Sequence, residues 1–167
     1  MKTIAELLPL AIGVALVGAL TVFLLDRNAT LGRWLLAGLL FAHGWVHMMF
    51  VFPKPEPANA SSAVEWPFDF ARSWLISGAG LDAALIRSLG IMLMVSVLLG
   101  FVFAAMSTVG ILIPVGWWAG LLVASSAVSF LMLAVFASPA FLIGFAINIA
   151  LIVFVFAAVW SPTAKIP

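Results

Sequence analysis

Residues 89–108 read LGIMLMVSVLLGFVFAAMST, and no charged side chain occurs among them. A helix of this length is about 30 Å long, which matches the hydrocarbon core of a bilayer. Peptide groups in hydrocarbon have no water to bond, so such a run must coil and satisfy its own N–H and C=O groups. The stretch therefore predicts a transmembrane helix, which we place at about residues 83–108.

Four more stretches reach a comparable length, and together they predict an all-α fold. We expect a transmembrane helical bundle of about five spans, in one integral membrane domain that covers residues 1–167. The spans are expected at about residues 4–25, 33–52, 83–108, 115–137 and 140–160. Short loops make neighbouring spans antiparallel. Asp82 suits the N-cap of the third span, and Ser138-Pro139 suits an N-cap followed by proline before the fifth.

Two alternative assignments fail on length. The first apolar run is longer than the 7 to 15 residues of a signal-peptide core, so we interpret it as a retained span. A single broken helix over residues 119–160 would exceed the thickness of any bilayer at 1.5 Å per residue. Two spans remain the better assignment for that region.

Composition excludes several classes of protein. The chain is 66% hydrophobic and 8% charged, with a mean hydropathy of +1.31, whereas about a quarter of a soluble domain is charged. Seven basic and six acidic residues are too few and too scattered for a nucleic-acid partner. The sequence has no cysteine, which excludes disulfides, thiolate metal sites and cysteine nucleophiles.

Residues 53–81 form the extramembrane connection between the second and third spans. Pro53, Pro55 and Pro57 end the second span. If Pro67 opens a short helix, then Trp66, Phe70 and Trp74 share one face of it at fourfold spacing, as suits a segment lying in the headgroup region. The alternative is an irregular aromatic loop folded over the mouth of the bundle, and the sequence leaves both open.

Small residues and tryptophans predict how the bundle packs and where it meets the membrane surface. Helices in lipid associate through close packing of small side chains. Such residues recur at fourfold spacing in every span: Ala11, Ala15 and Ala19; Gly38 and Ala42; Ser96, Gly100 and Ala104; Gly116, Gly120 and Ala124; Ala140 and Gly144. Indole rings prefer the interface. We therefore expect four tryptophans near span ends to be anchors: Trp34, Trp117, Trp118 and Trp160.

The candidate chemistry lies in His43-Gly44-Trp45-Val46-His47-Met48-Met49, inside the second span. Helical spacing of four places both imidazoles on one face, where they could share a metal ion or relay protons. The thioether of Met48 would bias such a site towards copper. A single axial histidine to haem or another tetrapyrrole, with Met92, Met94 or Met106 opposite, is the other cofactor hypothesis.

A structural role competes with these hypotheses. Two histidines are an incomplete ligand set, and the one acidic residue within the predicted spans, Glu6, lies at the start of the first span and not beside the histidines in the sequence. In that case His43 and His47 would form hydrogen bonds to neighbouring helices or lie near the membrane surface below Pro53. Proton or quinone handling by the two histidines is a separate alternative. Asn148 in the fifth span is expected to form an interhelical hydrogen bond. Ser125, Ser126 and Ser129 are expected to bond back to carbonyls of their own helix.

Charge near the span ends indicates an orientation. With an odd number of spans, the turn that carries Arg27 and Arg33 lies on the same side as the tail that carries Lys165. Short loops rich in positive charge stay in the cytoplasm. We therefore expect the N-terminus outside and the C-terminus inside.

From Ser73 onward the sequence resembles small bacterial polytopic membrane proteins of the loosely DoxX-like group. The residues that carry the resemblance are Ser73-Trp74-Leu75, Arg87, Leu89-Gly90, Gly100-Phe101, Trp117-Trp118, Ser129, Pro139, Gly144 and Asn148, with His43 and His47 before them. Where an acidic residue would be expected in the last span, this chain has Asn148. The resemblance implies a helical bundle in a bacterial inner membrane and assigns no reaction.

The leading functional hypothesis is a non-catalytic accessory or structural subunit that packs against partner membrane proteins or a second copy of itself. The competing hypothesis is a redox or cofactor-binding membrane protein that uses His43, His47 and a methionine to hold copper or haem. A small transporter is a third, and it is the least supported because the charged residues within the predicted spans, Glu6, Arg33 and Arg87, all lie in the first five residues of a span.

Overall fold

The computed structural model describes residues 2–54 and 66–162, and the described part is helical with no strand. Pro55, Pro57 and Lys165 lie outside the described residues. The elements in chain order are α1 (Lys2–Arg27), α2 (Ala29–Val46), η1 (His47–Phe50), η3 (Phe70–Arg72), α3 (Trp74–Ser77), α4 (Ala83–Val109), η4 (Val115–Trp117), α5 (Trp118–Val135), η5 (Pro139–Phe141) and α6 (Leu142–Phe156). The predicted all-α class is confirmed.

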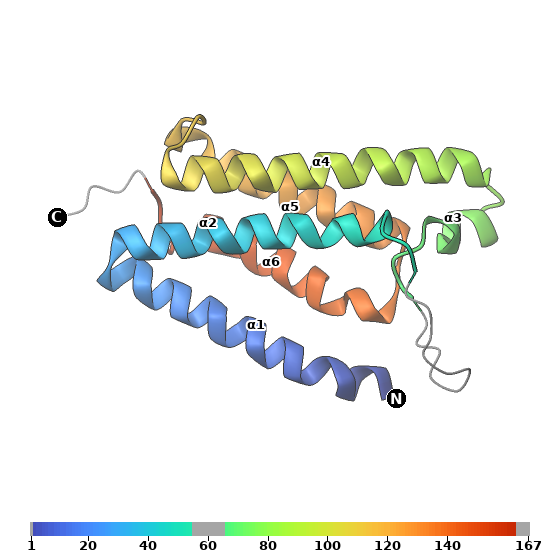
Figure 1. Cartoon of the computed structure of the whole chain (residues 1–167), viewed down its shortest axis with the longest axis horizontal. Helices are drawn as coiled ribbons and strands as arrows, with labels where there is room; N and C mark the ends of the chain where they lie inside the picture. Colours follow the sequence, from blue (N-terminus) through green and yellow to red (C-terminus); the bar gives the residue numbers. More distant parts are fainter. Residues whose placement is uncertain (1, 55–65, 163–167) are drawn as a thin grey trace.

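The long helices run lengthwise and alternate in direction (Figure 1). Four helical segments among the described residues are long and apolar enough to cross a membrane: Leu7–Arg27, Ala83–Val109, Val115–Val135 and Pro139–Phe156. The helix α2, continued by η1, runs between α1 and α4 over a similar length and completes a bundle of about five spans. The chain is an integral membrane protein.

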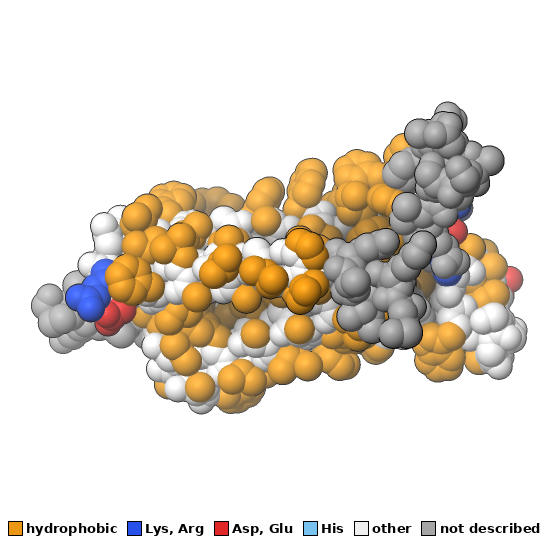
Figure 2. All heavy atoms as spheres, turned by 90° about the horizontal axis from the view of Figure 1, so that it is seen from below, with side chains coloured by type: hydrophobic (Ala, Val, Ile, Leu, Met, Phe, Trp, Pro, Cys, Tyr) orange, Lys and Arg blue, Asp and Glu red, His pale blue; other side chains and the backbone are white. Residues whose placement is uncertain are grey.

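The surface of the bundle is apolar where a bilayer would contact it. Figure 2 shows hydrophobic side chains along the length of one face, with acidic and basic side chains near its two ends. Large apolar residues are exposed on every long helix, among them Leu16, Phe41, Leu99, Leu131 and Val153. Contact of such a surface with lipid tails costs no free energy, whereas its contact with water is unfavourable.

Local capping explains where the helices begin. The Asn28 side chain accepts from Leu31 N at 3.1 Å and starts α2 one residue after α1 ends. Asp82 Oδ1 accepts from Leu85 N at 2.9 Å, as predicted for the N-cap of α4. Ser138 Oγ accepts from Ala140 N, and Pro139 occupies the first turn of η5, also as predicted. These caps satisfy N–H groups that have no partner within the helix.

Of the two arrangements that the sequence left open, the single short helix after Pro67 does not form, and Trp66, Phe70 and Trp74 do not share a helical face. Ser73 has an extended backbone and separates the single turn η3 from the short helix α3. Its hydroxyl, which is fully buried, donates to Val135 O at 2.7 Å and so ties the connection to the end of α5. Phe70 turns inward, whereas Trp74 is exposed and donates from Nε1 to Ala134 O.

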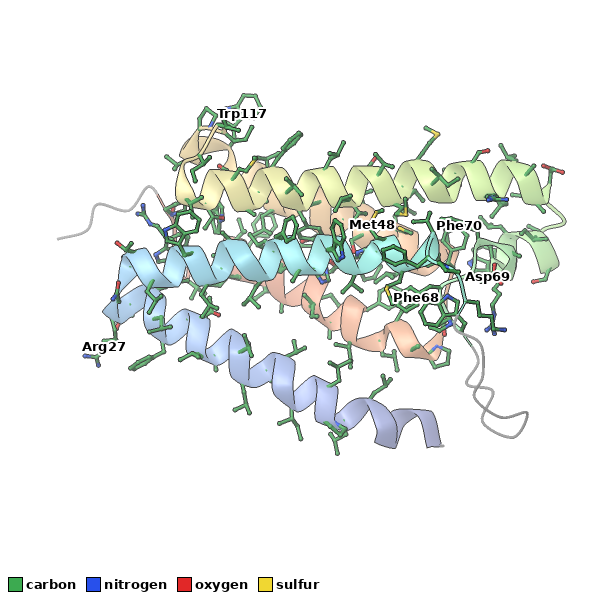
Figure 3. All side chains as sticks on the ribbon, viewed as in Figure 1. Arg27, Met48, Phe68, Asp69, Phe70 and Trp117 are labelled. Carbon is green, nitrogen blue, oxygen red and sulfur yellow. The ribbon has the colours of Figure 1, made fainter. Side chains whose placement is uncertain are left out.

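An aromatic cluster closes this end of the bundle. Figure 3 shows Phe68 and Phe70 beside the end of α2. The cluster consists of Phe50, Trp66, Phe68, Phe70, Phe136 and Phe141, whose ring centroids lie 5.1–5.8 Å apart in the contacting pairs. The described part of the connection is therefore an irregular aromatic segment folded over the bundle mouth, which is the alternative that the sequence left open.

Only some of the predicted small-residue positions bring helices together. A Cβ added at Gly100 would collide with Ser125 Oγ on α5, and one added at Gly144 would lie 2.8 Å from Leu133 Cδ1. Gly44, which belongs to no predicted stripe, lets α2 approach α4, since an added Cβ would lie 2.8 Å from Phe101 Cβ. By contrast, Gly38 and Gly116 face open space.

One of the predicted tryptophan anchors is a core residue. Trp118 is 3% exposed and packs edge-on against Phe154 and Trp160 at centroid distances of 6.1 and 5.6 Å. Its neighbour Trp117 is 64% exposed and points away from the bundle in Figure 3. Both tryptophans lie near a span end, so their positions in the sequence do not distinguish them. The packing of α5 against α6 buries Trp118 and leaves Trp117 exposed.

Helix α1 diverges from the rest of the bundle (Figure 1). At its C-terminal end it packs tightly on α2, because an added Cβ at Gly32 would lie 2.6 Å from Leu25 N. It also contacts η5. The predicted stripe of Ala11, Ala15 and Ala19 lines a cavity instead of packing against a neighbouring helix.

Candidate functional site

Four polar side chains meet inside the bundle and form the candidate site. His43 comes from α2, His47 from η1, Ser129 from α5 and Asn148 from α6. His47, Ser129 and Asn148 are buried, and His43 is half-buried. We call this group the polar ring, because its hydrogen bonds return to the residue at which they begin.

Distances between the four residues are those of direct hydrogen bonds. His43 Nε2 lies 3.0 Å from Asn148 Oδ1, and Asn148 Nδ2 donates to Ser129 Oγ at 2.8 Å. Ser129 Oγ lies 2.9 Å from His47 Nε2, and His47 Nδ1 lies 3.1 Å from the backbone oxygen of His43. The series of hydrogen bonds that begins at the His43 side chain therefore ends at the His43 backbone.

The backbone oxygen in this ring determines the direction of every bond. A carbonyl only accepts, so His47 Nδ1 carries the proton and, in a neutral imidazole, His47 Nε2 is an acceptor. The Ser129 hydroxyl then donates to His47 and accepts from the Asn148 amide. Asn148 Oδ1 accepts in turn from His43 Nε2–H. A neutral His43 is left with Nδ1 as an acceptor, and this atom has no hydrogen-bond partner among the described residues.

The polar ring joins three helices at mid-bundle. A polar group buried without a partner in an apolar interior costs free energy, and each interhelical bond in a membrane is worth about 0.6 kcal/mol. Phe101 of α4 packs edge-on against the His43 ring at a centroid distance of 4.8 Å and covers the site from that helix. The ring thus favours one register of α2, α5 and α6 over others.

The structure brings His43 and His47 together as the sequence predicted, with ring centroids 5.5 Å apart. Both nitrogens of His47 and one of His43 are engaged in the polar ring, so binding a metal through both imidazoles would require breaking these bonds. Met48 is half-buried and packs against the apolar core. The predicted copper or haem role of these residues stays a prediction.

Ser129 is the residue that sequence reasoning missed. We expected it to bond back to its own helix, as Ser125 does to Leu121 O at 2.6 Å, but its hydroxyl joins His47 and Asn148 instead. The positions of Ser129 and Asn148 in the sequence could have predicted their contact. Ser129 and Asn148 lie at nearly equal distances before and after the Ser138-Pro139 turn, so an antiparallel α5–α6 pair brings them to the same level.

A cavity of about 840 Å³ lies between α1, α2 and α6, and His43 is one of the residues that line it. The other lining side chains are apolar except that of Thr21, whose hydroxyl donates to Val17 O at 2.7 Å within α1. The lining includes several glycines and alanines: Ala11, Gly13, Ala15, Gly18, Ala19, Ala42, Ala146 and Ala150. Small residues on all three helices are what leave this space open.

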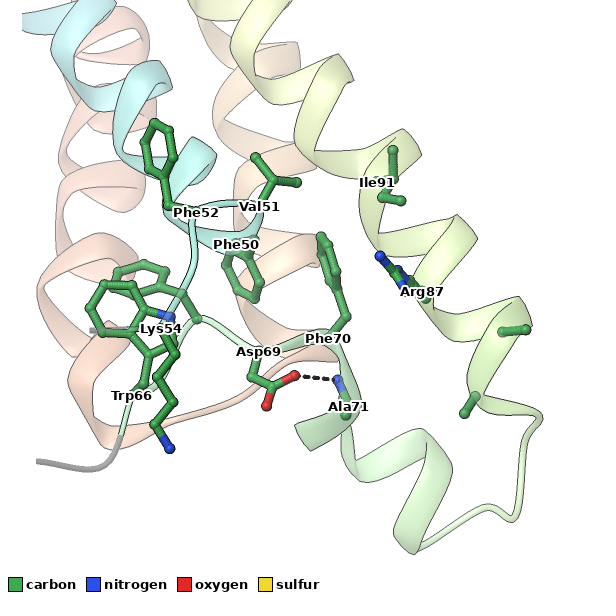
Figure 4. Close-up of a pocket in the computed structure, with 13 residues that line it drawn as sticks. Phe50, Val51, Phe52, Lys54, Trp66, Asp69, Phe70, Ala71, Arg87 and Ile91 are labelled. Carbon is green, nitrogen blue, oxygen red and sulfur yellow. Dashed lines mark hydrogen bonds between the residues drawn. The ribbon is translucent and has the colours of Figure 1, made fainter. Parts of the chain in front are cut away.

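A second cavity of about 610 Å³ lies beside the aromatic cluster (Figure 4). Its lining includes Lys54, Asp69 and Arg87, and Asp69 Oδ1 accepts from Ala71 N at 2.9 Å to cap η3. Trp66 Nε1 is buried here without an acceptor among the described residues. This cavity shares no lining residue with the first, so charged groups and the polar ring belong to separate parts of the molecule.

The residues on which the DoxX-like resemblance rests have diverse positions. Ser129 and Asn148 belong to the polar ring, Gly100 and Gly144 to close helix contacts, and Trp117 to the surface. Most of them serve packing, which any helical bundle requires, and the resemblance stays a prediction. Comparison with family models, with curated proteins and with solved structures finds no match to this chain.

Proposed function

We propose that this chain is a non-catalytic accessory subunit of the membrane, and that α1 is the element that packs against a partner membrane protein. The observation that carries the proposal is the position of α1. It packs on α2 at its C-terminal end, diverges from α2 towards its N-terminus (Figure 1), contacts η5 and lines a cavity with its inner side.

The outward side of α1 is distinct from the side that lines the cavity. Leu8, Ile12, Leu16 and Leu20 follow one another at fourfold spacing, are 50–65% exposed and do not line the cavity. Helices in lipid gain stability from side-chain packing against another helix. A transmembrane helix of a partner, laid along this side, would supply packing that the described part of the chain does not provide.

The polar ring supports a structural role for the histidines. Its side chains hold α2, α5 and α6 to one another through hydrogen bonds. In this proposal the ring keeps the bundle rigid while α1 makes the external contact, and no reaction is assigned to it.

We further propose the bacterial cytoplasmic membrane as the location, with the N-terminus outside and the C-terminus inside. Arg33 Nη2 donates to Pro162 O at 2.9 Å, so the α1–α2 turn and the end of the described chain lie together. Arg27 and Arg33 would then be cytoplasmic, in keeping with positive charge on that side. Reporter fusions after residue 28 and after the C-terminus should both report a cytoplasmic position.

Site-specific cross-linking tests the subunit proposal, because the absence of cysteine from the sequence makes single-cysteine variants clean. Leu16→Cys on α1 carries a thiol-reactive benzophenone, and native membranes are irradiated before extraction. We expect a cross-linked product whose mass identifies the partner or a second copy.

Leu99→Cys on α4 is the matched control, since Leu99 is also an exposed leucine of a long apolar helix. It should cross-link to lipid and give no defined protein product. If Leu16→Cys gives no more product than Leu99→Cys, and gently isolated complexes have the mass of one chain, the proposal is wrong.

A further inference from the structure

His43 combines two features that the packing of the bundle does not explain. Its Nδ1 is an acceptor with no hydrogen-bond partner among the described residues, as the direction of the polar ring requires. The same residue lines the cavity between α1, α2 and α6. An acceptor left unpaired in an apolar cavity is unfavourable, so a donor that reached it would be stabilised.

We propose that this cavity binds a lipid-like molecule with a long aliphatic chain and a hydroxyl headgroup, and that the hydroxyl donates a hydrogen bond to His43 Nδ1. The inference goes beyond the accessory role, since it concerns the inner side of α1 and not the outward leucines.

The shape of the cavity suits an aliphatic chain. Its lining on α1 extends from Pro9 to Leu25, a stretch that is about 24 Å long at 1.5 Å per residue. The volume of about 840 Å³ falls within the range of small-molecule sites, roughly 300–1,000 Å³. A space of this length and volume can hold one or two hydrocarbon chains.

The depth of His43 selects the headgroup. It lies seven positions before Phe50, the end of η1, and so about 10 Å inside the span. A charged phosphate or ammonium group is costly at that depth. A hydroxyl carries no charge, and its single donor matches the single free acceptor. Thr21 does not compete for this role, because its own hydroxyl donates to Val17 O.

A pair of probes tests the hydrogen bond in the unmodified protein. Hexadecan-1-ol and hexadecyl methyl ether share the same chain, but only the alcohol can donate. In phosphatidylcholine nanodiscs, each competes with a diazirine-labelled hexadecanol for photolabelling of the chain. We expect the alcohol to bind about two- to tenfold more tightly than the ether, as one net hydrogen bond gives. Equal affinities would overturn the assignment of His43 as the polar contact.

A pair of variants tests the location. Gly18 lines the cavity and Gly38 does not, and both have open space where a side chain would begin. Gly18→Leu should abolish saturable labelling, whereas Gly38→Leu should retain it. Mass spectrometry of the wild-type protein should place the label on α1, α2 or α6. Labelling on the outer surface of α4, or labelling that survives Gly18→Leu, would show that the chain binds elsewhere.

Discussion

Asn148 Nδ2 donates to Ser129 Oγ over 2.8 Å, and this bond joins α6 to α5 at one level of an antiparallel pair. Asn148 accepts from His43 at the same time, so one side chain connects α2, α5 and α6. In a membrane, where lipid competes equally well for apolar surface, a bond of this kind distinguishes one helix arrangement from others.

Replacing Asn148 should therefore weaken the bundle. Asn148→Leu keeps the volume but leaves His43 Nε2–H and Ser129 Oγ without their partner. Since an unsatisfied buried polar group costs about 1–3 kcal/mol, we expect a loss of at least 2 kcal/mol in the free energy of unfolding. Unfolding in mixed micelles with increasing denaturing detergent measures it. Ser88→Ala is the control, because Ser88 is exposed and bonds only to Ala84 O within α4. A similar loss in both variants would contradict a special role for the ring.

Two glycines of α2 should respond oppositely to the same substitution. Gly44→Ala places a methyl group 2.8 Å from Phe101 Cβ and forces α2 away from α4, at a cost of about 1–3 kcal/mol. Gly38→Ala meets open space and should be neutral or stabilise by up to about 1 kcal/mol, because alanine is the better helix former. Thermal unfolding of both variants in the same detergent provides the comparison. Equal effects would show that the two helices do not approach closely at Gly44.

Adjacent tryptophans provide a second matched pair. Trp118→Ala removes a ring that is 3% exposed and contacts Phe154 and Trp160, and it should cost about 3 kcal/mol. Trp117→Ala removes a 64% exposed ring and should cost under about 1 kcal/mol. Unfolding free energies from the same detergent series test the difference. The reverse order would place Trp118 at the membrane surface, where the sequence alone predicted it.

Ser73 should hold the aromatic connection to the bundle. Its hydroxyl donates to Val135 O at 2.7 Å and also caps α3 by accepting from Leu75 N at 3.3 Å. Ser73→Ala should cost about 1–2 kcal/mol and increase amide hydrogen exchange in α3 and η3 while leaving α4 protected. Ser96→Ala serves as the comparison, since Ser96 is exposed and bonds to Met92 O in its own helix. Unchanged exchange in α3 would show that the connection is held by its aromatic side chains alone.

The helices themselves were predictable from the sequence. Runs such as residues 89–108 coil in lipid whatever surrounds them, because the backbone has no other source of hydrogen bonds. The caps at Asp82 and Ser138 were also predictable, since a capping side chain bonds to N–H groups two or three residues away. The conformation of the connection between the second and third spans was not predictable. Whether Phe70 turns inward or shares a face with Trp74 depends on a bond from Ser73 to Val135, which is distant in the sequence.

The candidate site, too, was predictable from the sequence only in part. Spacing along the predicted second span was enough to place His43 and His47 together, and the bundle class followed from composition and run lengths. Only the tertiary structure brought Ser129 to His47, buried Trp118 while leaving Trp117 exposed, and moved α1 away from α2 and α6 to leave a cavity beside His43. The physical reason is that coiling is satisfied within each apolar run, whereas the choice of neighbouring helix depends on contacts between residues far apart in the chain.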